Sequence, residues 1–179
     1  MELNTDIKNW PLDLLLDYVL KIYHRGAREM MPEIEGLMSQ VIENDRAHHA
    51  DLHKVQELFS ASVCDLNVHF QKEENILFPY VVEMFESVAD GVQPQPMHCG
   101  TVSHPIAVMM SDHEGETLRY DEIVRLTDDY TAPGDASAEY RLLMKYLKQF
   151  HQALLEHIYL ENEIIFPRAI SFESKYVGG

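Results

Sequence analysis

The chain has 179 residues and a mass of 20.7 kDa, enough for one domain with a substantial hydrophobic core. Its 30 acidic residues against 14 Lys and Arg give a net charge of −16. This balance argues against nucleic acid or an anionic membrane as the main partner, because both require a cationic face. An apolar share of 46% excludes a disordered chain, and the 10 histidines make metal-cation binding a hypothesis to follow.

The N-terminus lacks the basic and apolar regions of a signal peptide, and no apolar run is long enough to span a membrane. Cys64 and Cys99 have no metal-binding or redox spacing, so they favour a reduced compartment. We therefore expect a cytoplasmic protein, in which Cys64 packs within a helix.

Apolar residues recur with helical spacing in four stretches, and strand-like alternation is hard to find. We expect Pro32 to bend the first helix or to start a second segment within it. Gly and Pro predict loops at 90–100 and 131–135. The four helical stretches are 11–41, 52–77, 105–124 and 143–165.

Four helices with marked loops between them predict an all-α fold, an antiparallel up-down-up-down four-helix bundle. The bundle is expected over residues 11–172. A short N-terminal extension, 1–10, precedes it, and a C-terminal tail, 173–179, follows it.

An internal repeat carries the residues with metal-binding chemistry. The pattern H-x-x-x-E, followed after two positions by two apolar residues and F-P, occurs at 69–79 and 157–167, which begin 88 residues apart. A single histidine precedes each copy, His24 and His113, and these lie 89 residues apart. The chain is therefore interpreted as two helix pairs in tandem.

Residues at i and i+4 lie on one face of a helix, about 6 Å apart, so each repeat His points the same way as its Glu. Apolar neighbours place these faces toward the bundle interior, where an unpaired carboxylate is costly. Cations between the side chains would explain the set, and hydrogen-bonded His–Glu pairs without metal are the alternative. The candidate ligands are His24, His69, Glu73, His113, His157 and Glu161.

Imidazole and carboxylate ligands without thiolate suit Fe, Zn, Mn or Cu. Structural zinc takes four ligands in a closed site, whereas six ligands from two symmetric halves suit two metals. Each metal would take His ligands at its own end, with the two Glu residues bridging. A non-haem di-iron centre fits best, and the order and spacing of His and Glu argue against a ferritin-type ferroxidase.

The arrangement resembles the hemerythrin-like, or HHE cation-binding, four-helix bundles. Within them it is most similar to bacterial di-iron proteins that repair iron–sulfur clusters damaged by oxidative and nitrosative stress. The PIxxMxxxH segment at 105–113 and the LENxxxFPRA segment at 160–169 favour this subgroup. The similar segments are 16–24, 69–79, 105–114 and 157–169, spread over about residues 11–170.

The resemblance implies that these six residues hold two non-haem iron ions, bridged by Glu73 and Glu161 together with an oxo or hydroxo group. Oxygen-carrying hemerythrins use a fifth His, so one ligand fewer leaves more open coordination here. Full-length repair proteins often carry an N-terminal domain with adjacent cysteines, and this sequence has no such pair. A repair step that needs those cysteines would be absent or supplied by a partner.

The function that the resemblance implies is a stress response in which the protein donates iron to an apo iron–sulfur protein or processes NO. The expected small ligands are O2, NO or peroxide. One alternative is a module that binds or senses O2 or NO without catalysis, and a weaker one is metal storage. Enzymatic activity and the oligomeric state are left open.

Several polar residues outside the ligand set receive simpler interpretations. His48, His49 and His53 indicate a solvated helix end near acidic residues. Glu74 and Glu163 are expected to turn away from the ligand face and to be exposed. The aromatic residues near the candidate ligands are expected to pack in the core, and the alternative is that they contact a bound ligand or the site. These residues are Tyr18, Tyr23, Tyr159 and His151.

Overall fold

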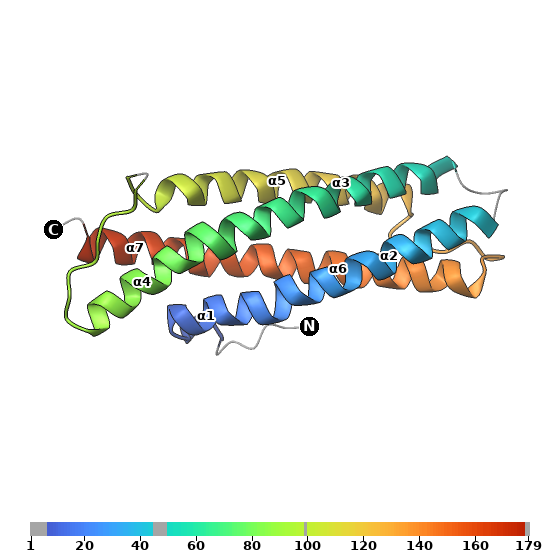
Figure 1. The fold of residues 1–179 in the computed structure, drawn as a ribbon. Coiled ribbons are helices and arrows are strands. Elements are labelled where there is room, and N and C mark those ends of the chain that lie inside the picture. Colours follow the sequence, from blue (N-terminus) through green and yellow to red (C-terminus); the bar gives the residue numbers. More distant parts are fainter. Residues whose placement is uncertain (1–6, 45–49, 99, 178–179) are drawn as a thin grey trace.

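The computed structural model describes residues 7–44, 50–98 and 100–177, which form four long helical rods (Figure 1). A 3-10 turn, η1 (Ile7–Asn9), precedes the first rod. The first rod comprises α1 (Leu12–Tyr18), the π-helical turn η2 (Val19–His24) and α2 (Arg25–Asn44). The second comprises α3 (Ala50–Lys72), the π-helical turn η3 (Glu73–Leu77) and α4 (Phe78–Ala89). The third is α5 (Ser103–Leu126), and the fourth comprises α6 (Ala138–Leu160), the π-helical turn η4 (Glu161–Ile165) and α7 (Phe166–Tyr176).

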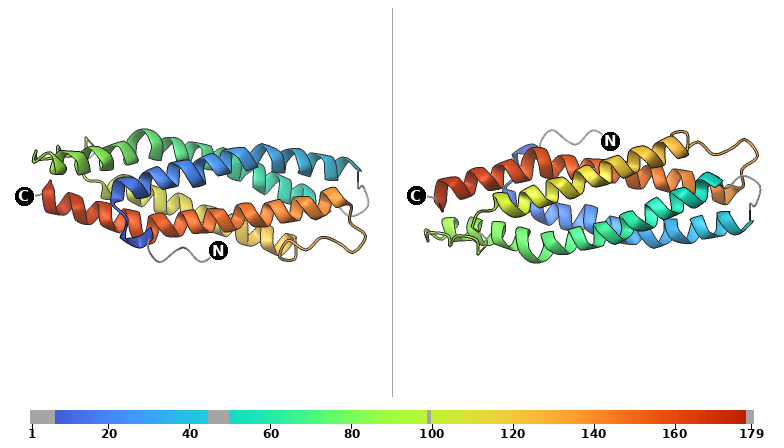
Figure 2. Two further views of the ribbon diagram at one scale, coloured as in Figure 1. Left: turned by 90° about the horizontal axis from the view of Figure 1, so that it is seen from below. Right: turned by 90° about the horizontal axis from the view of Figure 1, so that it is seen from above.

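Successive rods run in opposite directions and lie side by side in all three views (Figures 1 and 2). Helix α2 packs on α6 and on α3, while α3 also packs on α5. At the other end of the molecule α4 contacts both α1 and α7. The all-α, up-down-up-down four-helix bundle is thus confirmed, and the loops predicted at 90–100 and 131–135 lie between helices.

Pro32 does not start a second segment, because it lies inside the continuous helix α2. A proline removes one helical hydrogen bond, and the buried side chains of Met31 and Ile34 keep this stretch packed in the core despite that loss. The first rod instead departs from α-helical geometry earlier, at η2.

Each F-P dipeptide of the repeat begins an α-helix directly after a π-helical turn. Pro79 follows η3 and Pro167 follows η4, at the same place in the two copies. Proline cannot donate a hydrogen bond to the preceding turn, which is compatible with a wider turn just before it. Such π turns are common at functional sites, and Glu73 and Glu161 are the first residues of these two.

Two buried apolar clusters stabilise the bundle on either side of its middle. The first joins α2, α3, α5 and α6, and its largest side chains include Phe59, Phe70 and Tyr120. The second joins α1, α4, α7 and the start of α5, and includes Leu15, Leu16 and Phe166. The polar residues between them are therefore shielded from solvent at both ends.

Buried residues lie just outside both borders predicted for the bundle, residues 11 and 172. Ile7, from the segment expected as an N-terminal extension, is buried in the second cluster. Helix α7 continues to Tyr176, beyond residue 172, and the Glu173 carboxylate is buried where it accepts hydrogen bonds from the Val102 amide and the Tyr80 hydroxyl.

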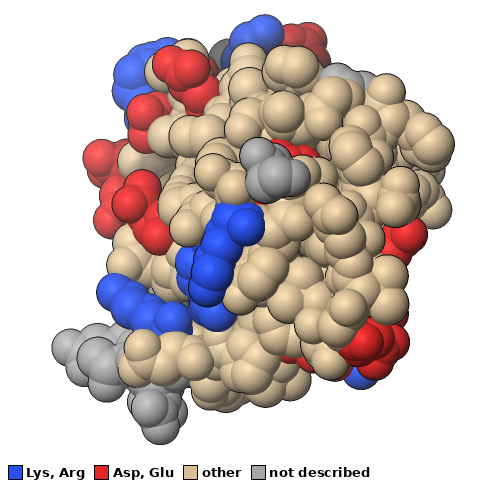
Figure 3. All heavy atoms as spheres, turned by 90° about the vertical axis from the view of Figure 1, so that its left-hand side faces the viewer, with Lys and Arg blue, Asp and Glu red and all other residues tan. Residues whose placement is uncertain are grey.

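Most of the described acidic side chains lie on the surface of the bundle. Viewed from the end where α4 and α7 terminate, acidic side chains form several separate groups and much of the face carries no charge (Figure 3). Cys64 is exposed on α3, so the expectation that it packs is wrong: the buried positions around it are Ser62 and Leu66. Within the described residues, no helix is long and apolar enough to cross a membrane. His53 is exposed, while His48, His49 and Cys99 lie outside the described residues.

Candidate metal centre

The six residues predicted as ligands meet in the middle of the bundle. His24 lies in η2, His69 at the end of α3 and His113 in α5. The other three come from η3, α6 and η4, so all four rods contribute. Every one of the six is at most 2% exposed: His24, His69, Glu73, His113, His157 and Glu161.

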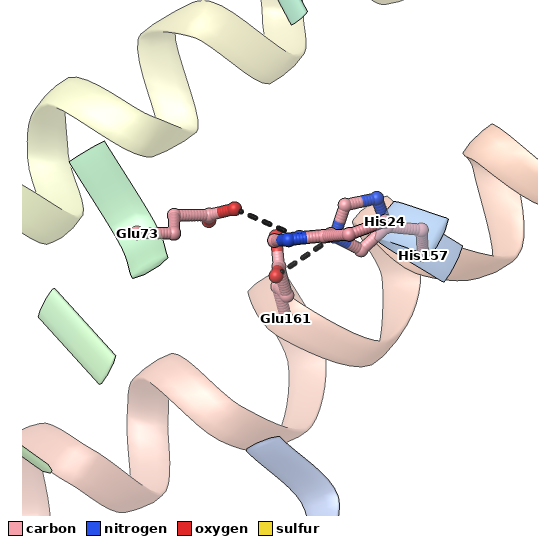
Figure 4. A group of neighbouring side chains, drawn as sticks. All are labelled: His24, Glu73, His157 and Glu161. Carbon is pink, nitrogen blue, oxygen red and sulfur yellow. Dashed lines mark hydrogen bonds and ion pairs between the residues drawn. The ribbon is translucent and has the colours of Figure 1, made fainter. Parts of the chain in front are cut away.

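Glu73 lies between two imidazoles and points one carboxylate oxygen at each. Its Oε2 lies 3.3 Å from His24 Nε2, and its Oε1 lies 3.3 Å from His69 Nε2. Figure 4 shows the carboxylate reaching across to His24 from the opposite side of the site. One carboxylate therefore connects the two ends of the centre.

Glu161 repeats this arrangement from the fourth rod. Its Oε1 lies 2.8 Å from His157 Nε2, and its Oε2 lies 3.1 Å from His113 Nε2. Figure 4 shows Glu161 and His157 side by side, as their spacing of four residues requires. The six residues thus form two groups, and within each group the ligand atoms lie within 4.8 Å of one another. One group is His24, Glu73, His157 and Glu161, and the other is His69, Glu73, His113 and Glu161.

Several of these buried atoms lack a hydrogen-bond partner among the described residues. They are His24 Nε2, both oxygens of Glu73, and Glu161 Oε2. In addition, His69 Nε2 and His113 Nε2 face each other at 3.1 Å. Buried polar atoms are normally satisfied, so unpaired acceptors that converge on two points fit bound cations. Nitrogen and oxygen donors of this kind suit Fe, Zn, Mn or Cu.

Electrostatics within the metal-free cluster follow from the same contacts. Burial alone would lower the pKa of His69, but the neighbouring Glu73 carboxylate and the charge of Glu161 raise that pKa to about 9. Burial likewise opposes the rise in the pKa of His157, which the charge of Glu161 produces. The pKa of Glu161 is lowered well below its ordinary value, against the effect of burial, by His157 and His113. A cation would replace protons on these imidazoles.

A second layer of hydrogen bonds fixes the orientation of His24. Its Nδ1 donates to Glu74 Oε1 at 2.8 Å, and Arg28 holds the same carboxylate with two hydrogen bonds. The expectation that Glu74 is exposed is therefore wrong: it is half-buried. Glu74 does turn away from Glu73, but this direction brings it to His24 on the neighbouring rod. Such partners set the tautomer and ring orientation of a metal-ligating His.

The repeat extends to this second layer. His113 Nδ1 donates to Asn162 Oδ1 at 2.9 Å, and Asn162 occupies the position that Glu74 occupies in the first copy. The phenylalanine of each F-P dipeptide also stacks on the single His of its own half. The ring centroids of Phe78 and His24 are 5.9 Å apart, and those of Phe166 and His113 are 6.0 Å apart.

The remaining two imidazoles have different neighbours. His69 Nδ1 lies 3.3 Å from Asp112 Oδ2, which also accepts a hydrogen bond from Lys72. His157 instead stacks on Tyr23 with 5.5 Å between the ring centroids. Sequence reasoning did not assign Asp112 to the site, although it directly precedes His113, as Tyr23 directly precedes His24.

Other polar candidates lie away from the two groups. The His151 ring stacks on Tyr120 at 4.9 Å, and its Nδ1 shares a hydrogen bond with the Tyr130 hydroxyl. Glu163 is exposed as expected. The Tyr159 hydroxyl accepts a hydrogen bond from Lys8.

Two of the hollows that reach the centre lie on different sides of it. A pocket of about 230 Å³ between the first and fourth rods extends to His157, and its walls are mainly apolar, including Tyr23, Phe70 and Leu154. A groove of about 260 Å³ between α3 and α5 extends to His69 and His113. Its walls carry charged side chains: Asp65, Lys72, Asp112, Glu116 and Arg119.

Comparisons with known proteins agree with this geometry. Residues 15–169 match the family described as the hemerythrin HHE cation binding domain. The chain is 31% identical over 170 residues to the iron-sulfur cluster repair protein YtfE of Musicola paradisiaca (strain Ech703), covering 93% of this chain and 71% of the relative. It is also 31% identical over 169 residues to the YtfE proteins of Yersinia pestis (strain Pestoides F) and Yersinia pseudotuberculosis serotype O:1b (strain IP 31758). Those matches cover 94% of this chain and 70% of each relative. The predicted resemblance to HHE and cluster-repair proteins is confirmed.

Proposed function

Because the chain belongs to the hemerythrin HHE cation-binding family, we propose that its six buried His and Glu residues hold two non-haem iron ions. We further propose that it acts in oxidative or nitrosative stress, in the repair of damaged iron–sulfur clusters. The names of its YtfE relatives support this role. An iron–sulfur apo-protein is then its proposed macromolecular partner.

The observation that carries the proposal is the pair of shared carboxylates. Glu73 and Glu161 each direct one oxygen to the His24/His157 end and the other to the His69/His113 end. A single closed zinc site needs only four ligands, and it would not need two carboxylates in this position. Two cations bridged by both carboxylates would satisfy the unpaired buried atoms.

The protein's own contribution is to position these donors and to exclude bulk water. Glu74 accepts a hydrogen bond from His24 Nδ1, and Asn162 accepts one from His113 Nδ1. The Nε2 atom of each of these two imidazoles therefore points into the site. The apolar clusters on both sides shield the site from solvent along the length of the bundle. Two iron ions bound here would supply Lewis-acid and redox chemistry.

The apolar pocket at His157 supports a small, weakly polar ligand such as NO or O2. With two His residues at each end and two shared carboxylates, the ligand set leaves coordination positions open. This pocket also suits the second candidate function, a module that binds or senses O2 or NO without taking part in repair.

An iron-transfer assay tests the repair role. Iron-loaded protein is mixed anaerobically with an apo-ferredoxin, a thiol and sulfide, and cluster formation is followed by its visible absorption. If the protein donates iron, clusters form on the apo-ferredoxin faster than in a control that contains free ferrous iron and a chelator in place of the protein. Retention of all the iron, together with reversible O2 or NO binding, would contradict donation and favour the binding module.

A further inference from the structure

A row of aromatic rings leads from one end of the centre toward the surface. Tyr23 stacks almost parallel on His157, with ring centroids 5.5 Å apart and an angle of 8° between the planes. Tyr18 meets the edge of Tyr23 at 5.7 Å, and Trp10 meets Tyr18 at 5.6 Å. Each ring therefore touches the next, without an intervening aliphatic side chain.

Exposure increases along this row. His157 is 2% exposed and Tyr23 is 7% exposed, whereas Tyr18 and Trp10 are half-buried. Trp10 is the single tryptophan of the chain, and it is held in place where Arg168 donates a hydrogen bond to its carbonyl oxygen. The row thus connects a buried ligand position to a side chain that solvent can reach.

Comparison of the two repeat copies indicates that the bundle does not need aromatic rings at the positions of Tyr18 and Tyr23 for packing. At the spacing of 89 residues that relates His24 to His113, Tyr18 corresponds to Ala107 and Tyr23 to Asp112. The second half of the bundle fills the same positions with a small residue and an acid. The aromatic row is therefore specific to the His24/His157 end.

Tyrosine and tryptophan are the side chains most readily oxidised by one electron without changing shape. We propose that Trp10, Tyr18 and Tyr23 form an electron relay that carries oxidising equivalents from the metal centre to the surface. The proposal rests on the proposed iron centre, with hydrogen peroxide as the oxidant. Such a relay protects the buried ligands, because the damage is moved to the half-buried indole of Trp10, which solvent can reach.

The proton movements have partners in the structure. Burial raises the pKa of the Tyr23 hydroxyl, and the neighbouring Tyr18 and Glu156 side chains raise that pKa further. When Tyr23 gives up an electron its hydroxyl proton passes to Glu156, and it returns when Tyr18 re-reduces Tyr23. Tyr18 releases its hydroxyl proton to solvent when it is oxidised and regains a proton when Trp10 re-reduces it, so both tyrosines end unchanged.

The overall reaction balances at Trp10. Two electrons leave the indole in succession, water adds one oxygen atom to the ring, and two protons are released. The peroxide takes up two electrons and two protons and becomes two molecules of water. The lasting product is a hydroxylated Trp10 and a net consumption of one peroxide.

A first experiment uses metal-free, chelator-treated protein and does not depend on iron. Flash-generated tris(bipyridine)ruthenium(III) oxidises Trp10, and transient absorption follows the tryptophan radical. Electron transfer between neighbouring rings is reversible, and only the addition of water at Trp10 makes the oxidation permanent. In the unmodified protein the radical on Trp10 is therefore shared with Tyr18, whereas Tyr18→Phe keeps the ring but confines the radical to Trp10 and makes it long-lived. Equal lifetimes in the two proteins would overturn the relay, even if the centre holds iron.

A second experiment uses iron-loaded protein treated with hydrogen peroxide, and mass spectrometry of the peptide that contains Trp10. Tyr18→Phe and Tyr23→Phe are expected to lose most of the oxygen addition at Trp10. Tyr146→Phe is the matched control, because Tyr146 is also half-buried but packs in the other apolar cluster. Unchanged oxidation of Trp10 in Tyr18→Phe would mean direct attack from solvent and would contradict the relay. If the protein takes up no iron, the proposed function fails while the flash experiment still decides the relay.

Discussion

The two ends of the candidate centre present the same ligand atoms in different surroundings. His24 and His157 lie among aromatic rings, with Phe70 stacked on His24 at 4.2 Å and Tyr23 stacked on His157. His69 and His113 lie beside a groove with charged walls, where Asp112 contacts His69. The donor set is symmetric, but its environment is not.

The difference can be traced to one pair of equivalent positions in the repeat. The residue before the single His is Tyr23 in the first half and Asp112 in the second, and each contacts the repeat His of the opposite half. A phenol ring excludes water from its neighbour, whereas a carboxylate with Lys72 beside it keeps a charged path open. Duplicated ligands can thus produce two cation positions with different access and basicity.

Removal of a shared carboxylate is expected to have the largest effect. Glu161→Ala takes one oxygen from each end and should reduce the metal content of both, from two ions per chain to nearly none. Metal analysis of the purified variant measures this loss. Glu163→Ala, at an exposed neighbouring position, is the matched control and should keep both ions. Retention of two ions in Glu161→Ala would refute the bridging role.

Removal of a histidine should separate the two ends. His24→Ala leaves the His69/His113 group complete, so about one ion per chain should remain, and His69→Ala should leave the other ion. Metal content and the optical spectrum of an anaerobic ferrous titration distinguish these cases. Loss of both ions from each variant would mean that the ends do not bind independently.

Smaller effects are expected from the hydrogen-bond partners of the ligands. Asp112→Asn removes the charge beside His69 and should weaken metal binding at that end by about 10- to 100-fold. Glu74→Gln should do the same at the His24 end, because the carboxylate that orients His24 becomes an amide. Competition with a chelator of known affinity measures both. Equal weakening at both ends in each variant would remove the basis for treating the ends as distinct.

The smallest effect is predicted for His151→Ala. His151 contacts Tyr120 and Tyr130 rather than either ligand group, so the metal content should stay near two per chain. A thermal unfolding curve checks that any small loss of metal does not follow from a less stable fold. A large loss of metal with unchanged unfolding would place His151 in the centre.

Helical spacing and the repeat predicted the fold and brought together the six buried residues. Periodicity works here because each rod has a single apolar face and each H-x-x-x-E pair lies on it. It did not predict the π turns that begin at Glu73 and Glu161, since these depend on hydrogen bonding within the folded helix. Nor did it place Glu74, because a residue that turns away from its own helix face can reach a ligand on the next helix.

The same limit explains the contacts of Tyr23 and Asp112. Their positions beside the single histidines were visible in the sequence, but which imidazole each would meet depends on how the rods pack. Pro32 also illustrates the point, because tertiary packing keeps α2 continuous where local preference favours a break.

Metal analysis and an anaerobic optical spectrum of the protein purified from iron-replete cells decide whether the six buried His and Glu residues hold a di-iron centre. We expect two iron ions per chain and, after oxidation, the absorption of a bridged di-iron centre. Two zinc ions per chain without that absorption would contradict this expectation.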